Sequence, residues 1–170
     1  RAGVFLHALG VDFSPRLEHG PVQQMFFEFR PTMATDLEGR WESYRVFMAP
    51  INWRFRSGDR AEFNVHPTGE RLTEPFEIID GVVIPPGTYQ WRRYRLEGGT
   101  AQKRRLYAQV TWWFGGFSDG TLDQVVWTGA WNPAALVTVE FFGERNVGRL
   151  QSGDFTQTLL AFSRNRRNLN

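Results

Sequence analysis

The sequence predicts an all-β fold, an antiparallel up-and-down meander that forms part of a transmembrane β-barrel. Three observations predict it. Apolar and polar residues alternate along many segments, and no segment shows a helical period. Several of these segments exceed the usual strand length of about five or six residues. The links between them alternate between short and long, which is typical of outer-membrane barrels.

Runs of aromatic and β-branched residues, broken by Gly, Pro, Asn and Asp, place the elements in chain order. Pro50 interrupts the longest run, and because proline lacks a ladder donor we expect an edge, a bulge or a strand portion above the membrane there. Segment 88–97 fits least well, since Arg92 and Arg93 point to opposite faces. The expected strands are 2–8, 22–30, 41–56, 60–67, 88–97, 103–114, 121–131, 134–143 and 154–164.

The links support the same architecture. Antiparallel neighbours joined by alternating short and long links would gather the short turns at one end of the sheet and the long loops at the other. We expect short links at 56–60, 97–101 and 132–133, an intermediate link at 115–120, and long links at 73–87 and 144–154.

The segment 104–120 shows the alternation most clearly, with an apolar face and a mostly polar one. We predict that the oily faces meet lipid at Leu106, Ala108, Val110, Trp112, Val137, Val139 and Phe141. We predict that the polar faces line a lumen at Arg54, Arg105, Gln109, Thr138 and Glu140. Aromatic rings near strand ends favour the headgroup level, so we predict interfacial positions for Trp41, Tyr89, Trp91, Trp113 and Trp131.

Period-two patterning also fits a soluble fold whose oily faces turn inward. A second hypothesis is therefore a soluble, lipocalin-like β-barrel that binds a small apolar ligand. The tripeptide "GRW" at 39–41 matches the Gly-x-Trp opening of lipocalins, but the expected strand 22–30 precedes it. Strand length, the placement of the aromatic rings and the polar opposite faces favour the membrane barrel.

The composition excludes several functional classes. The net charge is +2, so no strong positive field points to nucleic acid. The chain has no cysteine, so it has neither a disulfide framework nor a thiolate metal site. It has three histidines, His7, His19 and His66, and these lie in separate segments without the spacing of metal ligands.

Carboxylates offer the remaining candidate chemistry. Asp119 and Asp123 flank a turn, but their spacing is not that of a calcium loop. Glu62 and Glu140 lie on polar strand faces, where a pairing with arginine is the simpler interpretation. A third hypothesis, part of a carbohydrate-active enzyme, would need two carboxylates at a defined separation. The sequence assigns no catalytic, cofactor or metal residue, and we expect no cofactor.

Arginines gather near strand ends and short turns. We expect them to form salt bridges in the lumen and to extend to the interface; the alternative is contact with lipid phosphate, which guanidinium groups bind bidentately. The residues are Arg54, Arg56, Arg60, Arg92, Arg93, Arg95, Arg104 and Arg105.

Several segments in this order resemble the C-terminal region of domain-of-unknown-function family 5916. They are "GRWESYRVFMAPINWRFRSGDRAEFNV", "EPFEIIDGVVIPPGTYQWRRYRLEGGTAQKRR", "WWFGGFSDGTLDQ" and "VTVEFFGERNVGRLQSGDFTQTL", within residues 39–164. The family comprises large bacterial proteins, often with an N-terminal domain similar to family 9 carbohydrate-binding modules. Their C-terminal part looks like an outer-membrane β-barrel.

The resemblance implies a location and partners, and it transfers no catalytic residue. It implies the bacterial outer membrane, with membrane lipid and a periplasmic carbohydrate-binding-like module of the same protein as partners. We expect residues 1–170 to be one segment of a larger barrel. An odd number of expected strands agrees with this, because closed single-chain bacterial barrels normally have an even number.

Overall fold

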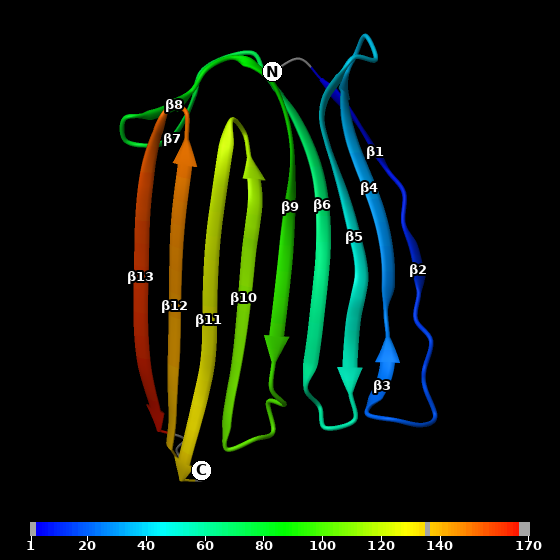
Figure 1. The fold of residues 1–170 in the computed structure, drawn as a ribbon, viewed down its shortest axis with the longest axis vertical. Coiled ribbons are helices and arrows are strands. Elements are labelled where there is room, and N and C mark those ends of the chain that lie inside the picture. Colours follow the sequence, from blue (N-terminus) through cyan, green and yellow to red (C-terminus); the bar gives the residue numbers. More distant parts are fainter. Residues whose placement is uncertain (1–2, 135–136, 167–170) are drawn as a thin grey trace.

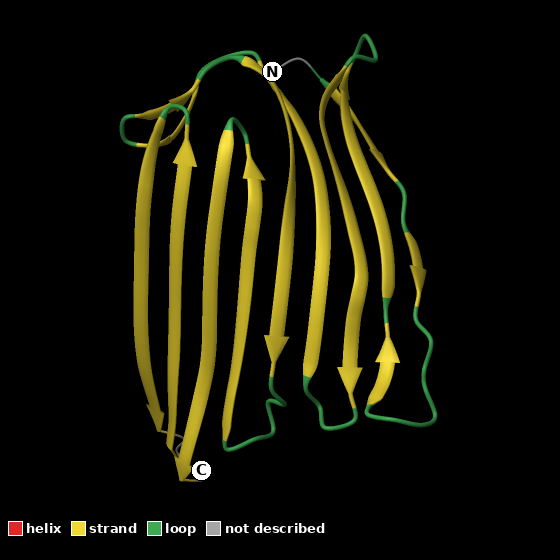
Figure 2. Ribbon diagram, in the orientation of Figure 1, coloured by secondary structure: helices red, strands yellow, loops and turns green. Residues whose placement is uncertain are grey.

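The computed structural model describes residues 3–134 and 137–166, and this part of the chain consists of β-strands and their links (Figures 1 and 2). The predicted all-β, antiparallel, up-and-down meander is confirmed. Among these residues, no helix is both long enough and apolar enough to span a membrane.

The strands differ widely in length, and the longest lie in the middle of the sheet and towards the C-terminus. In chain order they are β1 (Val4–Ala8), β2 (Val11–Phe13), β3 (Val22–Met25), β4 (Phe27–Asp36), β5 (Trp41–Phe55), β6 (Arg60–Leu72), β7 (Phe76–Ile79), β8 (Val82–Ile84), β9 (Gly87–Gly99), β10 (Leu106–Phe117), β11 (Gly120–Ala134), β12 (Val137–Leu150) and β13 (Gly153–Arg166).

One 11-stranded sheet contains all of these except β7 and β8, which form a separate hairpin. The main path runs β1-β4-β5-β6-β9-β10-β11-β12-β13, while β2 pairs with β4 and β3 with β5. Among the described residues β1 pairs only with β4, and β13 pairs only with β12. Both edges of the sheet are therefore open in this part of the chain.

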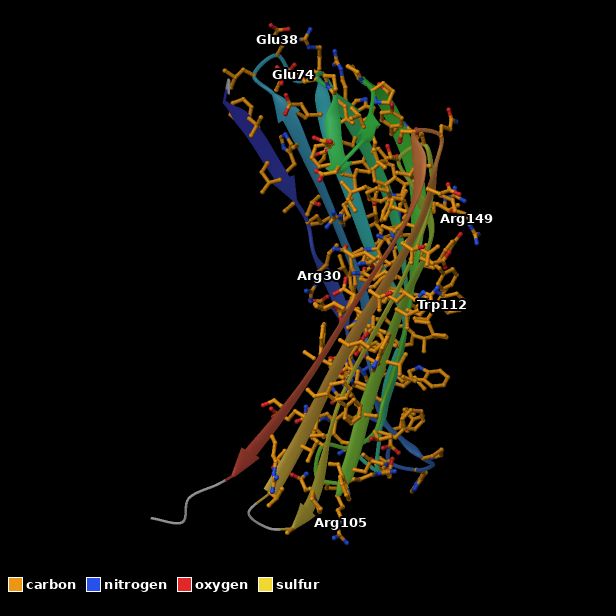
Figure 3. All side chains as sticks on the ribbon, turned by 90° about the vertical axis from the view of Figure 1, so that its left-hand side faces the viewer. Arg30, Glu38, Glu74, Arg105, Trp112 and Arg149 are labelled. Carbon is orange, nitrogen blue, oxygen red and sulfur yellow. The ribbon has the colours of Figure 1, made fainter. Side chains whose placement is uncertain are left out.

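The strand register divides the sheet into two chemically different faces. Trp112 of β10 lies opposite Leu96 of β9 and Val125 of β11, whereas its neighbour Thr111 lies opposite Glu97 and Val126. We call the face of Trp112 the apolar face and the face of Thr111 the polar face. In profile the sheet curves so that the polar face is concave: Trp112 and Arg149 project from the convex side, and Arg30 from the other (Figure 3).

The distribution of burial is the reverse of that in an ordinary soluble domain. Large hydrophobic side chains are exposed, among them Leu106, Val110 and Trp112, and Trp112 is 40% exposed. Charged and amide side chains are buried instead: Glu97 is 3% exposed and Asn64 0%. Exposed large apolar patches and buried polar groups are the informative departures from the usual pattern. They show that the apolar face is not the core of this sheet.

Each expected strand has a counterpart, but the predicted alternation of link lengths is wrong. The expected long loop at 144–154 is mostly strand, because β12 continues to Leu150 and β13 begins at Gly153. The expected link 115–120 is a turn at Ser118 and Asp119, and the "NP" at 132–133 lies within β11. Glycines in these segments suggested loops, yet they lie within strands. The short β2, β7 and β8 were not predicted, since three or four residues show no clear alternation.

The expectation for Pro50 is confirmed as a bulge. The β5–β6 register shifts between Met48 and Ile51, so the proline falls where the ladder is already interrupted. Ala49, beside it, is almost fully buried. The missing N–H of Pro50 therefore removes no regular ladder bond.

The longest link among the described residues, 73–86, carries the β7–β8 hairpin, which leaves the sheet between β6 and β9 and passes over to the upper ends of β12 and β13 (Figure 1). Val82 and Ile84 are buried, as is Leu150 at the end of β12. A Cβ placed on Gly153 would lie 3.5 Å from Val82 Cγ2. The hairpin thus packs against the β12–β13 turn.

Candidate functional site: a charged network on the concave face

Arg95 of β9 is the centre of a side-chain network on the polar face. Its guanidinium donates to Glu62 Oε1 at 2.8 Å, to Asn64 Oδ1 at 3.0 Å and to Glu97 Oε2. Alternation along β6 and β9 brings these side chains together, because Glu62 pairs with Glu97 and Asn64 with Arg95 in the ladder. Three polar residues on adjacent strands thus converge on one guanidinium.

Two further residues complete the network around Glu97. Arg60 forms an ion pair with Glu97 Oε1 at 2.8 Å, and the Thr111 hydroxyl donates to Glu97 Oε2 at 2.9 Å. Removing a carboxylate from water is costly unless it is paired and hydrogen-bonded. Two guanidinium groups and two carboxylates satisfy this requirement here, since Arg60 and Arg95 balance Glu62 and Glu97.

Aromatic rings lie beside the network. The guanidinium carbons of Arg93 and Arg95 each lie 5.6 Å from the ring centroid of Trp113. The His66 ring lies 4.9 Å from Trp113 on one side and 5.1 Å from Phe47 on the other. Trp113 was predicted at the headgroup level, and its place on the concave face among arginines does not fit that expectation. The strand alternation decides its face, and proximity to a strand end does not.

A smaller polar cluster lies on the same face further along the sheet. Glu144 Oε1 accepts hydrogen bonds from Gln124 at 2.9 Å and from Asn146 at 2.8 Å. Gln124 and Asn146 are ladder partners on β11 and β12. The polar character of the concave face therefore extends from β6 to β12.

The predicted lumen residues share the concave face with one exception. Gln109, Thr138 and Glu140 lie on it by strand alternation, and the Arg54 guanidinium lies 5.7 Å from the Phe26 ring on the same face. Arg105 precedes β10 at the lower rim (Figure 3), where it donates to the carbonyl oxygens of Asn132 and Pro133. It holds the end of β11 and takes no part in the network.

The predicted lipid-facing residues share the convex, apolar face. Leu106, Val110 and Trp112 are exposed there. The others are partly covered by neighbours: Ala108 lies opposite Gly129, which in turn lies opposite Phe141. The full set that the register places on this face is Leu106, Ala108, Val110, Trp112, Val137, Val139 and Phe141.

The remaining interfacial candidates divide between the faces. Trp131 is exposed on the apolar face. Tyr89 and Trp91 are spaced by two from each other and from Arg93, so all three lie on the polar face of β9. There the Trp91 ring contacts Phe117. The Trp41 ring packs against Tyr44 with centroids 5.7 Å apart. The expected aromatic belt is therefore not a single ring of residues on the outer face.

Sequence reasoning missed the hub of the network. It grouped Arg93 and Arg95 with arginines near strand ends and placed Glu62 on a polar strand face, but it did not join them. The available signal was the alternation of Glu62, Asn64 and His66 along one strand, with two arginines spaced by two along another. What the sequence could not give was the register that sets Asn64 opposite Arg95.

Among the described residues, no group of three or more His, Asp or Glu side chains is arranged to hold a metal ion. Comparison of the chain with protein-family models, with curated proteins and with solved structures finds no match.

Proposed function

We propose that this chain is a segment of an outer-membrane β-barrel, with its convex face in lipid and its concave face lining the interior. The observation that carries the proposal is the reversal of burial. Large hydrophobic side chains such as Val110 and Trp112 are exposed on one face, while Glu97 and Asn64 are buried on the other. This arrangement is favourable in hydrocarbon, because moving apolar surface out of water lowers the free energy.

Strand length supports the same function. β10 to β13 contain 12, 15, 14 and 14 residues. A tilted strand needs about 9 to 11 residues to cross the hydrocarbon core. Each of these strands can therefore span the membrane and extend beyond it.

Charged residues on the apolar face mark an upper limit to the oily band. Arg92, Asp123 and Arg145 lie on this face towards the upper end, and Trp112 Nε1 donates to Asp123 Oδ1 at 3.2 Å. Arg145 lies level with Trp112, because both pair with Val125, while β10 itself is apolar on this face from Leu106 to Phe114. Eight steps of about 3.3 Å give roughly 26 Å along the strand, or about 20 Å of height at a tilt of about 40°, against an apolar band of about 25 Å in outer-membrane barrels.

The family resemblance adds a context to this geometry. If the chain is part of a protein of family 5916, the barrel spans the outer membrane and anchors a periplasmic carbohydrate-binding-like module or passes a solute to it. Its mechanism is passive: the apolar face holds the wall in lipid, and the charged network keeps the inner face rigid and polar. No catalytic step is assigned to any residue.

Spin labels on adjacent residues test the assignment of the two faces. The chain has no cysteine, so Val110→Cys and Gln109→Cys each give one labelling site on opposite faces of β10. In liposomes, the label at 110 should collide readily with oxygen and little with a water-soluble nickel complex, and the label at 109 should show the reverse. Equal access of the nickel complex to both positions in a folded, plain-buffer sample would instead favour a soluble barrel.

A further inference from the structure

We propose that the concave face binds a small oxyanion, a carboxylate or a phosphate, at a site formed by Asn64 and His66 of β6, Arg93 of β9 and Arg45 of β5. This inference rests on the proposed function only in taking the concave face as the one that water reaches. It goes further by assigning a ligand class to that face.

Unpartnered nitrogen atoms gather at this place. Asn64 Nδ2, His66 Nε2 and Arg93 Nε are buried and have no hydrogen-bond partner. His66 lies directly opposite Arg93 in the β6–β9 ladder, and Asn64 is the next residue on the same face of β6. The exposed fraction is 0% for Asn64 and 9% for His66. Leaving a buried polar group without a partner is unfavourable, so an acceptor shared by these groups would stabilise the site.

The orientation of Asn64 is set by the network beside it. Its Oδ1 accepts from Arg95 at 3.0 Å, so its Nδ2 points away from that guanidinium with both hydrogens. Arg93 is held by the Trp113 ring and by a hydrogen bond from its Nη2 to the carbonyl oxygen of Leu122 at 3.2 Å. The donors are therefore fixed by contacts that an anion need not disturb.

The charge around the site is positive. Arg45, Arg93 and Arg95 all act electrostatically on His66, and Arg45 and Arg93 repel each other. Arg95 is neutralised by Glu62 and Glu97, whereas in the described part of the chain no ion pair joins Arg45 or Arg93 to a carboxylate. Only the more distant attraction of Asp123 acts on Arg93. An anion between Arg45 and Arg93 would relieve their repulsion.

Several N–H donors in a positive field match the oxygens of carboxylate or phosphate, because charge-assisted bonds to such oxygens are the strong ones. Arg45 is exposed and has a long, flexible side chain, so it can move to admit the ion and then close over it. The other donors lie on rigid strands, and the site is thus largely formed before binding.

Titration calorimetry with inorganic phosphate and, separately, with acetate tests the site in the intact protein in detergent, in a chloride buffer. Arg93→Gln should weaken binding about tenfold or more, which corresponds to the loss of one charge-assisted hydrogen bond. Arg92→Gln is the matched control, because Arg92 is the adjacent arginine on the apolar face, and it should change the affinity less than twofold. Binding of only one of the two anions would assign the ligand to that class.

If Arg93→Gln does not fold, Arg45→Gln and Asn64→Asp test the same site instead. Arg45 is exposed and its replacement should leave the fold intact while weakening binding, and the new carboxylate at position 64 should repel the anion. Absence of phosphate and acetate binding by folded protein, or equal losses in the Arg92 and Arg93 variants, would overturn the proposal. If the spin labels contradict the membrane orientation but the anion still binds, the anion site stands and the proposed membrane function does not.

Discussion

At the scale of single residues, cross-strand pairs of an aromatic ring and a glycine shape the sheet. Each ring lies over the place where its partner's side chain would be, so a Cβ built on the glycine would fall within 2.3 Å of a ring atom. The pairs are Tyr44 with Gly69, Trp127 with Gly143, Phe141 with Gly129, and Phe155 with Gly148. Gly69 and Gly148 lie outside the strands expected from the sequence, and the opposing ring explains their place in strands.

A methyl group at one of these glycines should destabilise the fold. In Gly143→Ala the Cβ would lie 2.1 Å from the Trp127 ring, and overpacking of this kind costs about 1–3 kcal/mol. Gly98→Ala is the control, because nothing lies within 4 Å of its Cβ position. Urea titration in detergent should show a lower midpoint for the Gly143 variant alone. Equal midpoints for both variants would contradict the close approach of Trp127.

The polar residues were predictable as a class but not as partners. Alternation assigns Glu62 and Gln109 to a polar face from the sequence alone. Whether Glu62 meets Arg95 or another arginine depends on the β6–β9 pairing register, which alternation alone does not fix. The network therefore had to come from the structure.

At the scale of elements, Asp59 joins two links at the lower end of the sheet. Its carboxylate accepts from the backbone N–H of Ala101 at 2.8 Å and from Arg104 at 2.7 Å. It lies in the β5–β6 turn, and its partners lie in the β9–β10 link. The pKa of Asp59 is lowered, first by the Ser57 hydroxyl and then by the Ala101 N–H and Arg104.

This pKa sets the sign of a pH effect. Because the folded-state pKa lies below the unfolded value of about 3.9, the carboxylate stabilises the fold above that pH, and the contribution is lost as pH falls through the folded-state pKa. Asp59→Asn should therefore lower the unfolding midpoint at pH 7, and the difference from the wild type should shrink as the pH falls below about 4 and vanish below the folded-state pKa. Asp80→Asn, in an exposed turn, serves as the control. A difference that persists unchanged at low pH would exclude this role for Asp59.

The β7–β8 hairpin is the element least visible in the sequence, and its packing can be tested directly. Ile84 is 2% exposed, and Ile84→Ala should lower the stability of the packed hairpin by about 2–4 kcal/mol. Val83 points outward, so Val83→Ala should have little effect. Limited proteolysis between residues 73 and 86 should accelerate only in the Ile84 variant. Equal cleavage rates in the two variants would show that the hairpin is not held at Ile84.

At the scale of the whole molecule, the open edges of the sheet matter most. Alternate backbone N–H groups of β13 point away from β12, and no strand among the described residues receives them. Hydrocarbon does not tolerate unpaired strand edges. If the chain forms a membrane barrel, another strand must pair with the outward edge of β13.

Hydrogen exchange on the intact protein in liposomes tests this requirement. Every second amide of β13, those that point away from β12, should exchange about as slowly as the amides that bond to β12. The β10–β11 ladder, which is paired on both sides, supplies the reference rates. Rapid exchange of the outward amides in membrane-inserted protein would mean that β13 is a true edge.

The architecture could be predicted at this scale because period-two alternation persists over many strands. The loop asymmetry could not, because strands such as β12 continue through Gly143 and Gly148, which appear as breaks in the sequence. The two faces follow from the pattern. The reversed burial of the two faces, with charged side chains covered by one another and large hydrophobic ones exposed, is visible only in the structure.

The hairpin between β6 and β9 has a mechanical consequence. Its Val82 reaches Gly153, so a segment from the middle of the chain braces the wall across β9, β10 and β11. This contact limits how far the sheet can flatten, because it connects the link between β6 and β9 to the turn between β12 and β13. Because Val82 and Gly153 lie far apart in the sequence, closing this contact before the intervening strands pair would cost chain entropy, and we expect it to form late.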